Sequence, residues 1–332
     1  MKYTNMGRTG MKVSRLCLGT MNFGAYTQEK EAFAIMERAV EAGINYFDTA
    51  NEYGDFFGVG RKGASEEIIG KWFAQGGGRR EKVILATKVY CSMEDVNDGP
   101  NNGEFISAYK IRRHLEGSLR RLGTDHIELY QMHHIDRSVT WEELWGVFEA
   151  LVNQGKVYYI GSSNFAGWHI MKAQEAAAKR NFLGLVCEQH LYNLMKRLPE
   201  LELLPVAKEK GLGVVLWGPL NGGSLAGNML NPKKGSRSEK KQSVDPVAPE
   251  LRAKLEAYAK LCDEMGESQA NVALAWTLAN PVVTAPIIGP RTLEQLEDCL
   301  HAVDIELSDE IMHRLDEIFP GPGGAAPEAY AW

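Results

Sequence analysis

Residues 44–53 read Ile-Asn-Tyr-Phe-Asp-Thr-Ala-Asn-Glu-Tyr, a short β-forming run that breaks at Asp48 into a polar loop ending on Tyr53. A carboxylate at a strand end can meet a phenol five residues later only if the strand end lies in a pocket. Four later apolar runs also end on polar residues, at 87–88, 133–134, 162–164 and 188–189. This repetition indicates that several strand ends bring polar side chains to one rim.

The composition excludes several classes of protein. The chain of 332 residues is 44% hydrophobic, carries a formal net charge of −6 and contains no basic stripe of the kind that neutralises phosphates. Its five cysteines lie far apart without C-x-x-C spacing, which is typical of reduced thiols. We find no apolar signal core and no run long enough to span a bilayer. We therefore expect a cytoplasmic protein with no metal site and no nucleic-acid or membrane partner.

Strand and helix patterns alternate along the chain. Strands are predicted at 16–18, 44–48, 83–89, 127–133, 157–163, 185–189, 213–217 and 285–289, and helices at 30–42, 65–74 with Ser65 as N-cap, 107–122, 141–154, 168–180, 199–210, 250–265, 268–279 and 292–303. Eight such strands predict a (β/α)8 TIM barrel, a single domain over residues 1–332 with long βα loops. An N-terminal hairpin is expected because residues 7–10 are turn formers. The competing doubly wound sheet needs a G-x-G-x-x-G motif after its first strand, and the chain lacks one there.

Barrel enzymes carry catalytic groups at the C-terminal ends of their strands, so the polar residues there are candidates. Reducing a carbonyl requires a proton donor, and the phenol of Tyr53 can serve if its pKa falls toward neutrality. The ammonium of Lys88 would lower that pKa, and the carboxylate of Asp48 would keep Lys88 charged. A histidine would orient the carbonyl oxygen, but alternation along the strand does not say whether His133 or His134 points inward.

Each candidate also has a structural interpretation. Asp48 and Lys88 could form an ion pair that caps the sheet, and Tyr53 could be a surface tyrosine in a polar loop. Lys88 could instead form a Schiff base, as in an aldolase or related lyase.

The motifs resemble those of the aldo-keto reductases, from Gly7-Arg8-Thr9-Gly10 to about Leu300. They are Phe47-Asp48-Thr49-Ala50-x-x-Tyr53-Gly54, Ala86-Thr87-Lys88, Leu122-Gly123-Thr124-Asp125-x-x-Glu128-Leu129-Tyr130-x-x-His133 and Gly161-x-Ser163-Asn164-Phe165. The resemblance implies an oxidoreductase that uses a nicotinamide cofactor without a Rossmann domain. It implies that Tyr53 is the general acid, that Asp48 and Lys88 tune it, and that His133 faces the substrate. Because the family includes channel-associated subunits, a weakly active NADP-binding regulatory subunit is a further alternative.

The same resemblance implies the contacts of the cofactor, NADP(H). Ser163, Asn164 and Gln189 should hold the carboxamide, and Trp217 should stack on the nicotinamide where the family usually has a tyrosine. The glycine-rich segment 218–225 resembles the family's pyrophosphate loop, although such a segment is more often a simple turn. Residues 228–249 read either as a basic flap or as a solvated loop. The expected contacts are Gly19, Thr20, Met21, Asp48, Ser163, Asn164, Gln189, Trp217, Gly218, Pro219, Leu220, Gly222, Ser224, Leu225, Arg237, Gly289, Arg291, Gln295 and Asp298.

Cofactor choice is assigned to Arg291, within the Gly289-Pro290-Arg291-Thr292-x-x-Gln295-Leu296 motif. A guanidinium at the start of a helix suits a 2′-phosphate, which favours NADP over NAD. Many relatives end this motif with Glu-Asn, whereas this chain has Asp298-Cys299.

The substrate is expected to be a small-molecule carbonyl compound. Its pocket should involve Phe23, Phe56, Tyr90 and the tail 319–332, whose Tyr330 and Trp332 could cover the mouth although the tail is too rich in proline and glycine for a helix. Glu94, Asp95 and Asp98 have no matching bases nearby, which favours a polar substrate. Segments 21–24, 72–80 and 164–169 resemble a bacterial subgroup that includes NDP-hexose 2,3-enoyl reductases, which implies a sugar or nucleotide-sugar. The oligomeric state is not predicted.

Overall fold

Eight parallel strands form a closed barrel in the order β10-β11-β12-β3-β4-β7-β8-β9, as the sequence predicted. The computed structural model describes residues 1–56, 58–232 and 247–331, without the side chains of residues 56, 330 and 331. The barrel strands are β3 (Cys17–Gly19), β4 (Tyr46–Asp48), β7 (Ile84–Val89), β8 (Ile127–Met132), β9 (Val157–Ser163), β10 (Leu185–Leu191), β11 (Gly213–Trp217) and β12 (Val283–Ile288). Their C-terminal ends therefore meet at one mouth.

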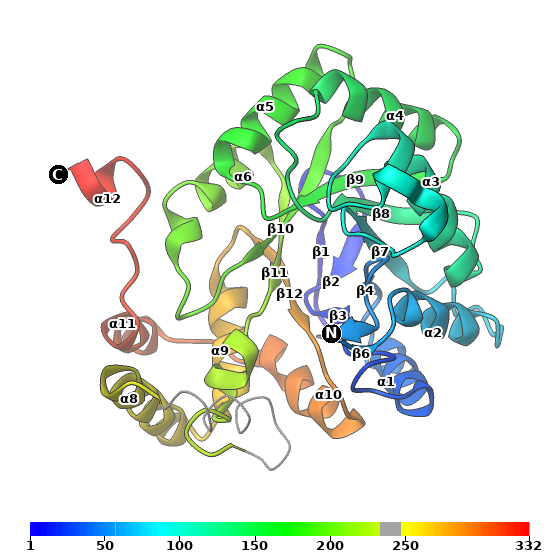
Figure 1. The fold of residues 1–332 in the computed structure, drawn as a ribbon. Helices are drawn as coiled ribbons and strands as arrows, with labels where there is room; N and C mark the ends of the chain where they lie inside the picture. The colour runs from blue at the N-terminus through cyan, green and yellow to red at the C-terminus, as the bar shows by residue number, and fades with distance from the viewer. Residues whose placement is uncertain (57, 233–246, 332) are drawn as a thin grey trace.

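A ring of helices surrounds the barrel (Figure 1). The helices are α1 (Glu29–Glu41), α2 (Ala64–Phe73), α3 (Ala108–Leu122), α4 (Trp141–Asn153), α5 (Gly167–Ala178), α6 (Leu203–Lys210), α8 (Pro249–Met265), α9 (Gln269–Ala279), α10 (Leu293–Leu300), α11 (Asp309–Ile318) and α12 (Glu328–Ala331), with 3-10 turns η1 (Val96–Asn101), η2 (Leu198–Glu200), η3 (Asn221–Ala226) and η4 (His301–Asp304). No helix in the described part of the chain is both long enough and apolar enough to cross a bilayer.

The expected N-terminal hairpin is present and closes the end of the barrel opposite the mouth. Strands β1 (Tyr3–Asn5) and β2 (Lys12–Ser14) pair antiparallel. Met6 and Val13 are fully buried and pack with residues from the interior of the barrel. Gly7 allows this fit, because a Cβ there would lie 2.4 Å from the Gly211 carbonyl oxygen. Only the mouth is left open to a ligand.

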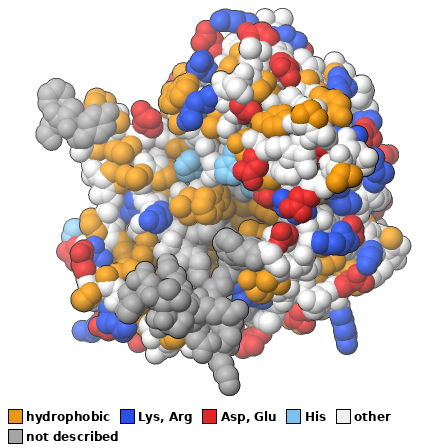
Figure 2. All heavy atoms as spheres, viewed as in Figure 1, with side chains coloured by type: hydrophobic (Ala, Val, Ile, Leu, Met, Phe, Trp, Pro, Cys, Tyr) orange, Lys and Arg blue, Asp and Glu red, His pale blue; other side chains and the backbone are white. Residues whose placement is uncertain are grey.

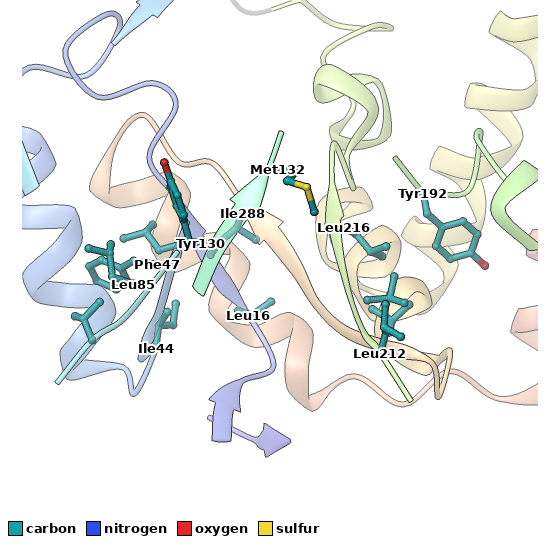
Figure 3. Close-up of a cluster of buried hydrophobic side chains, with 14 of the residues drawn as sticks. Leu16, Ile44, Phe47, Leu85, Tyr130, Met132, Tyr192, Leu212, Leu216 and Ile288 are labelled. Atoms are coloured by element: carbon teal, nitrogen blue, oxygen red, sulfur yellow. The ribbon is translucent and has the colours of Figure 1, made fainter. Parts of the chain in front are cut away.

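Two apolar cores follow from the alternation of the strands. One lies between strands and helices, and Figure 3 shows part of it, including Leu16, Phe47 and Tyr130. The other fills the barrel interior with Cys17, Tyr46, Ala86, Leu129, Cys187, Val215 and Ala285. All seven of these side chains are 0% exposed. The interior of the barrel is therefore a packed floor beneath the mouth.

Three local expectations are corrected. The N-cap of α2 is Gly63, whereas Ser65 lies inside the helix. The Ser65 hydroxyl donates instead to the Thr20 carbonyl oxygen at 2.9 Å, which ties α2 to β3. Helix α11 was not predicted, although Ser308 accepts a hydrogen bond from Ile311 N as its N-cap.

The tail was expected to contain no helix, but it ends in the short helix α12. Ala326 N donates to Leu201 O at 2.9 Å, which holds the tail beside the loop after β10. Figure 1 places α12 at the periphery of the helix ring and not over the barrel. The described part of the tail therefore does not cover the mouth.

Candidate active site

The mouth holds hydrogen bonds that lead from a carboxylate through an ammonium to a phenol. Asp48 ends β4, and Lys88 lies on β7, which pairs with β4. Lys88 Nζ lies 2.5 Å from Asp48 Oδ1 and donates to Tyr53 OH at 3.1 Å. It also donates to Thr49 O at 2.9 Å. Asp48 and Lys88 are only 2% and 0% exposed, so these three acceptors replace the water that the ammonium has lost.

The pKa values differ from the sequence expectation. Burial raises the pKa of Tyr53 to about 12, and the charge of Lys88 opposes this rise only in part. Burial lowers the pKa of Lys88, but Asp48 and Tyr53 together outweigh burial and raise that pKa above its usual value. Lys88 lowers the pKa of Tyr53 as expected, but the net pKa does not fall toward neutrality, because removing a phenolate from water costs more than the ammonium returns. At pH 7 Tyr53 is a neutral phenol beside a cation.

The same environment argues against a Schiff-base lysine. A Schiff base forms from a free amine that can reach a carbonyl carbon. Lys88 is fully buried, donates to three oxygens and has a raised pKa. Its nitrogen is therefore a held ammonium and not a nucleophile.

His133, not His134, lies beside the phenol. The rings of His133 and Tyr53 meet edge to face with centroids 5.8 Å apart. His133 is 9% exposed, whereas the His134 side chain is exposed and stacks on His133. Burial, with Lys88 as a second cause, lowers the pKa of His133 well below its usual value. His133 is thus a neutral imidazole at pH 7, able to donate or accept one hydrogen bond from each ring nitrogen.

Two buried amides hold the other oxygen of the Asp48 carboxylate. Gln131 Nε2 and Gln189 Nε2 donate to Asp48 Oδ2 at 3.0 and 2.8 Å. Gln131 was not among the residues predicted from the sequence, although its place two residues before His133 puts both side chains on the same face of the strand. Gln189 Nε2 also donates to Gln131 Oε1 at 3.5 Å. Because Nε2 of Gln189 is used in these contacts, its amide oxygen is the atom that could accept a hydrogen bond from a carboxamide N–H.

The expected carboxamide partners and the aromatic residue lie together on the next strands. Ser163 Oγ donates to Gln189 O at 2.9 Å, and Asn164 Nδ2 donates to His133 O at 3.1 Å. Trp217 Nε1 donates to Asn164 Oδ1 at 3.0 Å, while the Trp217 side chain is 38% exposed. An indole that is fixed at its edge and open on a face can stack on a flat ring. These residues fit a nicotinamide.

The loop after β11 turns sharply at two glycines. Gly222 and Gly223 have φ of +66° and +96°, so the backbone curls into the 3-10 turns of η3. The side chain of Leu225 is fully buried in the core, which leaves only its backbone for a ligand. Ser224 Oγ donates to Asn221 O at 3.0 Å. Contacts of Gly218, Pro219, Leu220 and this loop with pyrophosphate remain predictions.

At the end of β3, Gly19 and Thr20 have structural contacts of their own, and their contacts with a cofactor remain predictions. Thr20 is fully buried, its hydroxyl donates to Asp48 O at 3.1 Å, and its Oγ1 lies 2.8 Å from Ser65 Oγ. A Cβ at Gly19 would lie 2.4 Å from Ile287 Cγ2. Both residues therefore hold strands together. Met21 is partly exposed and is the member of this group whose side chain a cofactor could touch.

Arg291 packs against an aromatic ring and pairs with no carboxylate among the described residues. Its guanidinium lies over the ring of Tyr26, 4.4 Å from the centroid, and within the described residues no carboxylate lies at ion-pair distance. Burial lowers the pKa of Arg291, and Tyr26 offsets this in part. Gln295 Oε1 accepts from Arg291 N at 2.8 Å, so Gln295 supports this turn. Asp298 and Gly289 are exposed nearby along the chain. Tyr26 gave no signal in the sequence, and Arg237 lies outside the described residues.

The expected substrate residues are only partly brought together. Phe23 is fully buried in the core between strands and helices, so its predicted place in the pocket lining is wrong. Tyr90 lies edge to face on the exposed His134, with centroids 5.1 Å apart. Trp332 and the side chains of Phe56 and Tyr330 lie outside the described part of the structure. Figure 2 shows an apolar hollow in the centre of this face, with histidine side chains at its edge.

The acidic residues of the loop after β7 are paired, contrary to the sequence analysis. Arg113 on α3 binds both Asp95 and Asp98, and His114 Nε2 lies 3.2 Å from Asp98 Oδ2. Lys62 Nζ lies 2.9 Å from Glu94 Oε1. These carboxylates fold the loop onto α3 and therefore give no argument for a polar substrate.

Comparison with known proteins finds a family and several relatives that match nearly the whole chain. Residues 15–319 match the model of the aldo/keto reductase family. The chain is 61% identical to an uncharacterized oxidoreductase, YrpG, of Bacillus subtilis (strain 168) over the full length of both proteins. It is 30% identical to a versiconal hemiacetal acetate reductase of Aspergillus parasiticus, and 30% identical to a probable voltage-gated potassium channel subunit beta of Oryza sativa subsp. japonica, over 96% of each chain in both cases.

Proposed function

Because this chain is an oxidoreductase that belongs to the aldo/keto reductase family, we propose that it reduces an aldehyde or ketone with NADPH and that Tyr53 is the general acid. The observation that carries this proposal is the hydrogen-bonded series Asp48, Lys88 and Tyr53 at the mouth of the barrel, with neutral His133 beside the phenol. The bound nicotinamide would supply the hydride, and the residues of the chain would handle the proton.

In this proposal Tyr53 gives its phenolic proton to the carbonyl oxygen as negative charge develops there. Its pKa of about 12 keeps the proton on Tyr53 until that moment. Lys88 stays charged and stabilises the phenolate that is left, while Asp48 holds Lys88 in place. His133 orients the carbonyl by a hydrogen bond from the nitrogen that faces the mouth. Water is excluded by the buried setting of Asp48 and Lys88.

Arg291 supports the choice of NADPH. A half-buried guanidinium without a carboxylate partner among the described residues needs an anion, and a ribose 2′-phosphate is a dianion that suits its planar donors. Tyr26 would hold the guanidinium in place when the cofactor leaves. Ser163, Asn164, Gln189 and Trp217 would fix the other end, the nicotinamide.

The substrate class is proposed only as far as a small carbonyl compound. A sugar-like substrate now rests on the subgroup resemblance alone, because the loop acids are neutralised by Arg113 and Lys62. The relative described as a potassium channel subunit keeps a second function open, in which the chain binds NADP(H) with little turnover. Both functions predict cofactor binding, so turnover distinguishes them.

The test is a fluorescence titration with NADPH and NADH, followed by aldehydes, ketones and keto-sugars. We expect tight NADPH binding and oxidation that depends on the carbonyl compound. Arg291→Ala should weaken NADPH about 10- to 100-fold and NADH much less, since loss of a charged contact costs about 1.5–3 kcal/mol. Equal weakening of both cofactors would contradict the 2′-phosphate assignment. Binding without turnover on any carbonyl compound would favour the regulatory subunit.

A further inference from the structure

Three potential metal ligands converge at the edge of the mouth. Glu52 comes from the loop after β4, Cys91 follows β7 and His133 follows β8, and these three strands are neighbours in the barrel. One ligand atom from each residue lies within 4.8 Å of the other two. The sequence predicted no metal site because the three residues lie 39 and 42 positions apart, without the short spacing of a ligand motif. Only barrel closure brings them together.

The cluster contains a polar atom that lacks a partner. His133 Nδ1 is buried and makes no hydrogen bond with any described group, although the whole residue is only 9% exposed. Glu52 Oε1 lies 3.3 Å away without the alignment of a hydrogen bond. Two ligands of a tetrahedral ion with bonds of about 2.0 Å are separated by about 3.3 Å. The pair therefore already has the separation that a shared zinc-like ion requires.

We propose that Glu52, Cys91 and His133 bind one divalent cation of the zinc class through a carboxylate oxygen, a thiolate sulfur and Nδ1. This ligand set suits a borderline-soft ion better than magnesium or calcium, which prefer oxygen ligands alone. With three protein ligands, the fourth position is left to water. Burial, with Glu52 as a further cause, raises the pKa of the Cys91 thiol, so Cys91 must lose its proton to solvent when the ion binds.

The surroundings permit entry from the mouth, and they place acidic groups as well as the ammonium groups of Lys88 and Lys110 near the three ligands. The Glu52 side chain is 26% exposed, so an ion can reach the site from the mouth. The acidic group of Glu104 also acts on Cys91, where Lys110 opposes it.

A bound ion would fix the tautomer of the His133 imidazole. An ion on Nδ1 leaves the proton of the neutral imidazole on Nε2. Under the proposed function Nε2 is the nitrogen available to a carbonyl oxygen, so the ion would hold the donor form of the ring. This consequence rests on the proposed function, whereas ion binding itself does not.

The binding test uses the full chain, Zn²⁺ titration by calorimetry and the absorption spectrum with Co²⁺. We expect one ion per chain and a thiolate-to-cobalt charge-transfer band in the near ultraviolet. Cys91→Ser should remove that band and weaken Zn²⁺ about 100-fold, and Glu52→Gln should weaken it about tenfold. Cys299→Ser is the matched control, because Cys299 is 8% exposed and Cys91 is 7% exposed. No binding by wild type, or equal binding by Cys91→Ser, would overturn the site.

A second measurement does not depend on activity. In nitrogen-15 spectra of the imidazole groups, Zn²⁺ should shift Nδ1 of His133 and leave Nε2 protonated. An ion on Nε2, or no change at His133, would contradict the proposal. Failure of these experiments would leave the reductase proposal intact, and absence of turnover would leave the ion site intact.

Discussion

The two layers of side chains inside the barrel differ in chemistry although the same strands supply both. The floor contains Tyr46, Ala86, Leu129 and Cys187, and the mouth contains Asp48, Lys88, Gln131 and Gln189. Each mouth residue follows its floor residue by two positions, which is one period of a strand. A step of about 7 Å along the strands thus changes a dry core into a charged network.

This difference shows what each layer does. The floor gains stability by packing, and the hairpin closes it against water. The polar side chains of the mouth lose their contact with water on folding. Their charges must therefore be compensated by hydrogen bonds and ion pairs within the mouth. Burial then sets the pKa values of the mouth, as it does for Tyr53. The packed floor thus leaves the charged groups of the mouth poorly solvated.

The largest expected effect comes from removing the cation of the mouth. Lys88→Met leaves the buried carboxylate of Asp48 without its counter-charge, and we expect a loss of about 3–5 kcal/mol in the free energy of unfolding together with loss of turnover. Lys110→Met is the matched control, because Lys110 is also buried but donates to the carbonyl oxygens of Tyr90 and Gly103. Denaturant unfolding measures both. An equal loss of stability in the two variants would contradict the claim that the Asp48–Lys88 ion pair makes the mouth more sensitive than another buried lysine.

A floor residue should affect stability without affecting chemistry. Leu129→Ala opens a cavity below Gln131, and we expect a loss of about 2–4 kcal/mol in the free energy of unfolding. Turnover well below the melting temperature should stay within a few-fold of wild type, because no hydrogen bond of the mouth is removed. A drop of a hundredfold in a folded Leu129→Ala protein would show that the layers are not separable.

The smallest expected effect is a pH dependence of the free energy of unfolding that comes from His114. Burial lowers the pKa of His114, which Asp98 opposes and Lys110 and Arg121 reinforce. The unfolded chain therefore binds more protons than the folded protein below the ordinary value of about 6.5. Stability present above pH 6.5 is lost as the pH falls toward the folded pKa, by at most about 1.4 kcal/mol per pH unit.

His114→Gln is the variant that isolates this residue, since other histidines also titrate. Its free energy of unfolding should fall less steeply than that of wild type between pH 7 and pH 5. Parallel pH profiles for the two proteins would show that His114 is not held neutral by the fold.

The barrel could be predicted from the sequence because each strand shows a short β-forming pattern and the helices between them have recognisable periodicity and ends. The Asp48–Lys88 pair was predictable because each residue lies at or next to the C-terminal end of its strand. Partners supplied by other elements were not visible: Arg113 reaches back from α3 to Asp98, and Cys91 meets His133 only when β7 and β8 pair. The direction of the Tyr53 pKa shift depends on whether the effect of burial or the effect of the Lys88 charge is larger. The order of residues in the sequence does not reveal which effect is larger.

Tyr53→Phe tests the central claim most directly, since it removes one hydroxyl from the mouth and keeps the ring beside His133. The measurement is NADPH affinity together with single-turnover reduction of a carbonyl compound that wild type accepts. We predict NADPH binding within about twofold of wild type and a rate lower by about 10²- to 10⁴-fold, the range for loss of a general acid. A rate equal to that of wild type would contradict the assignment of Tyr53 as the proton donor.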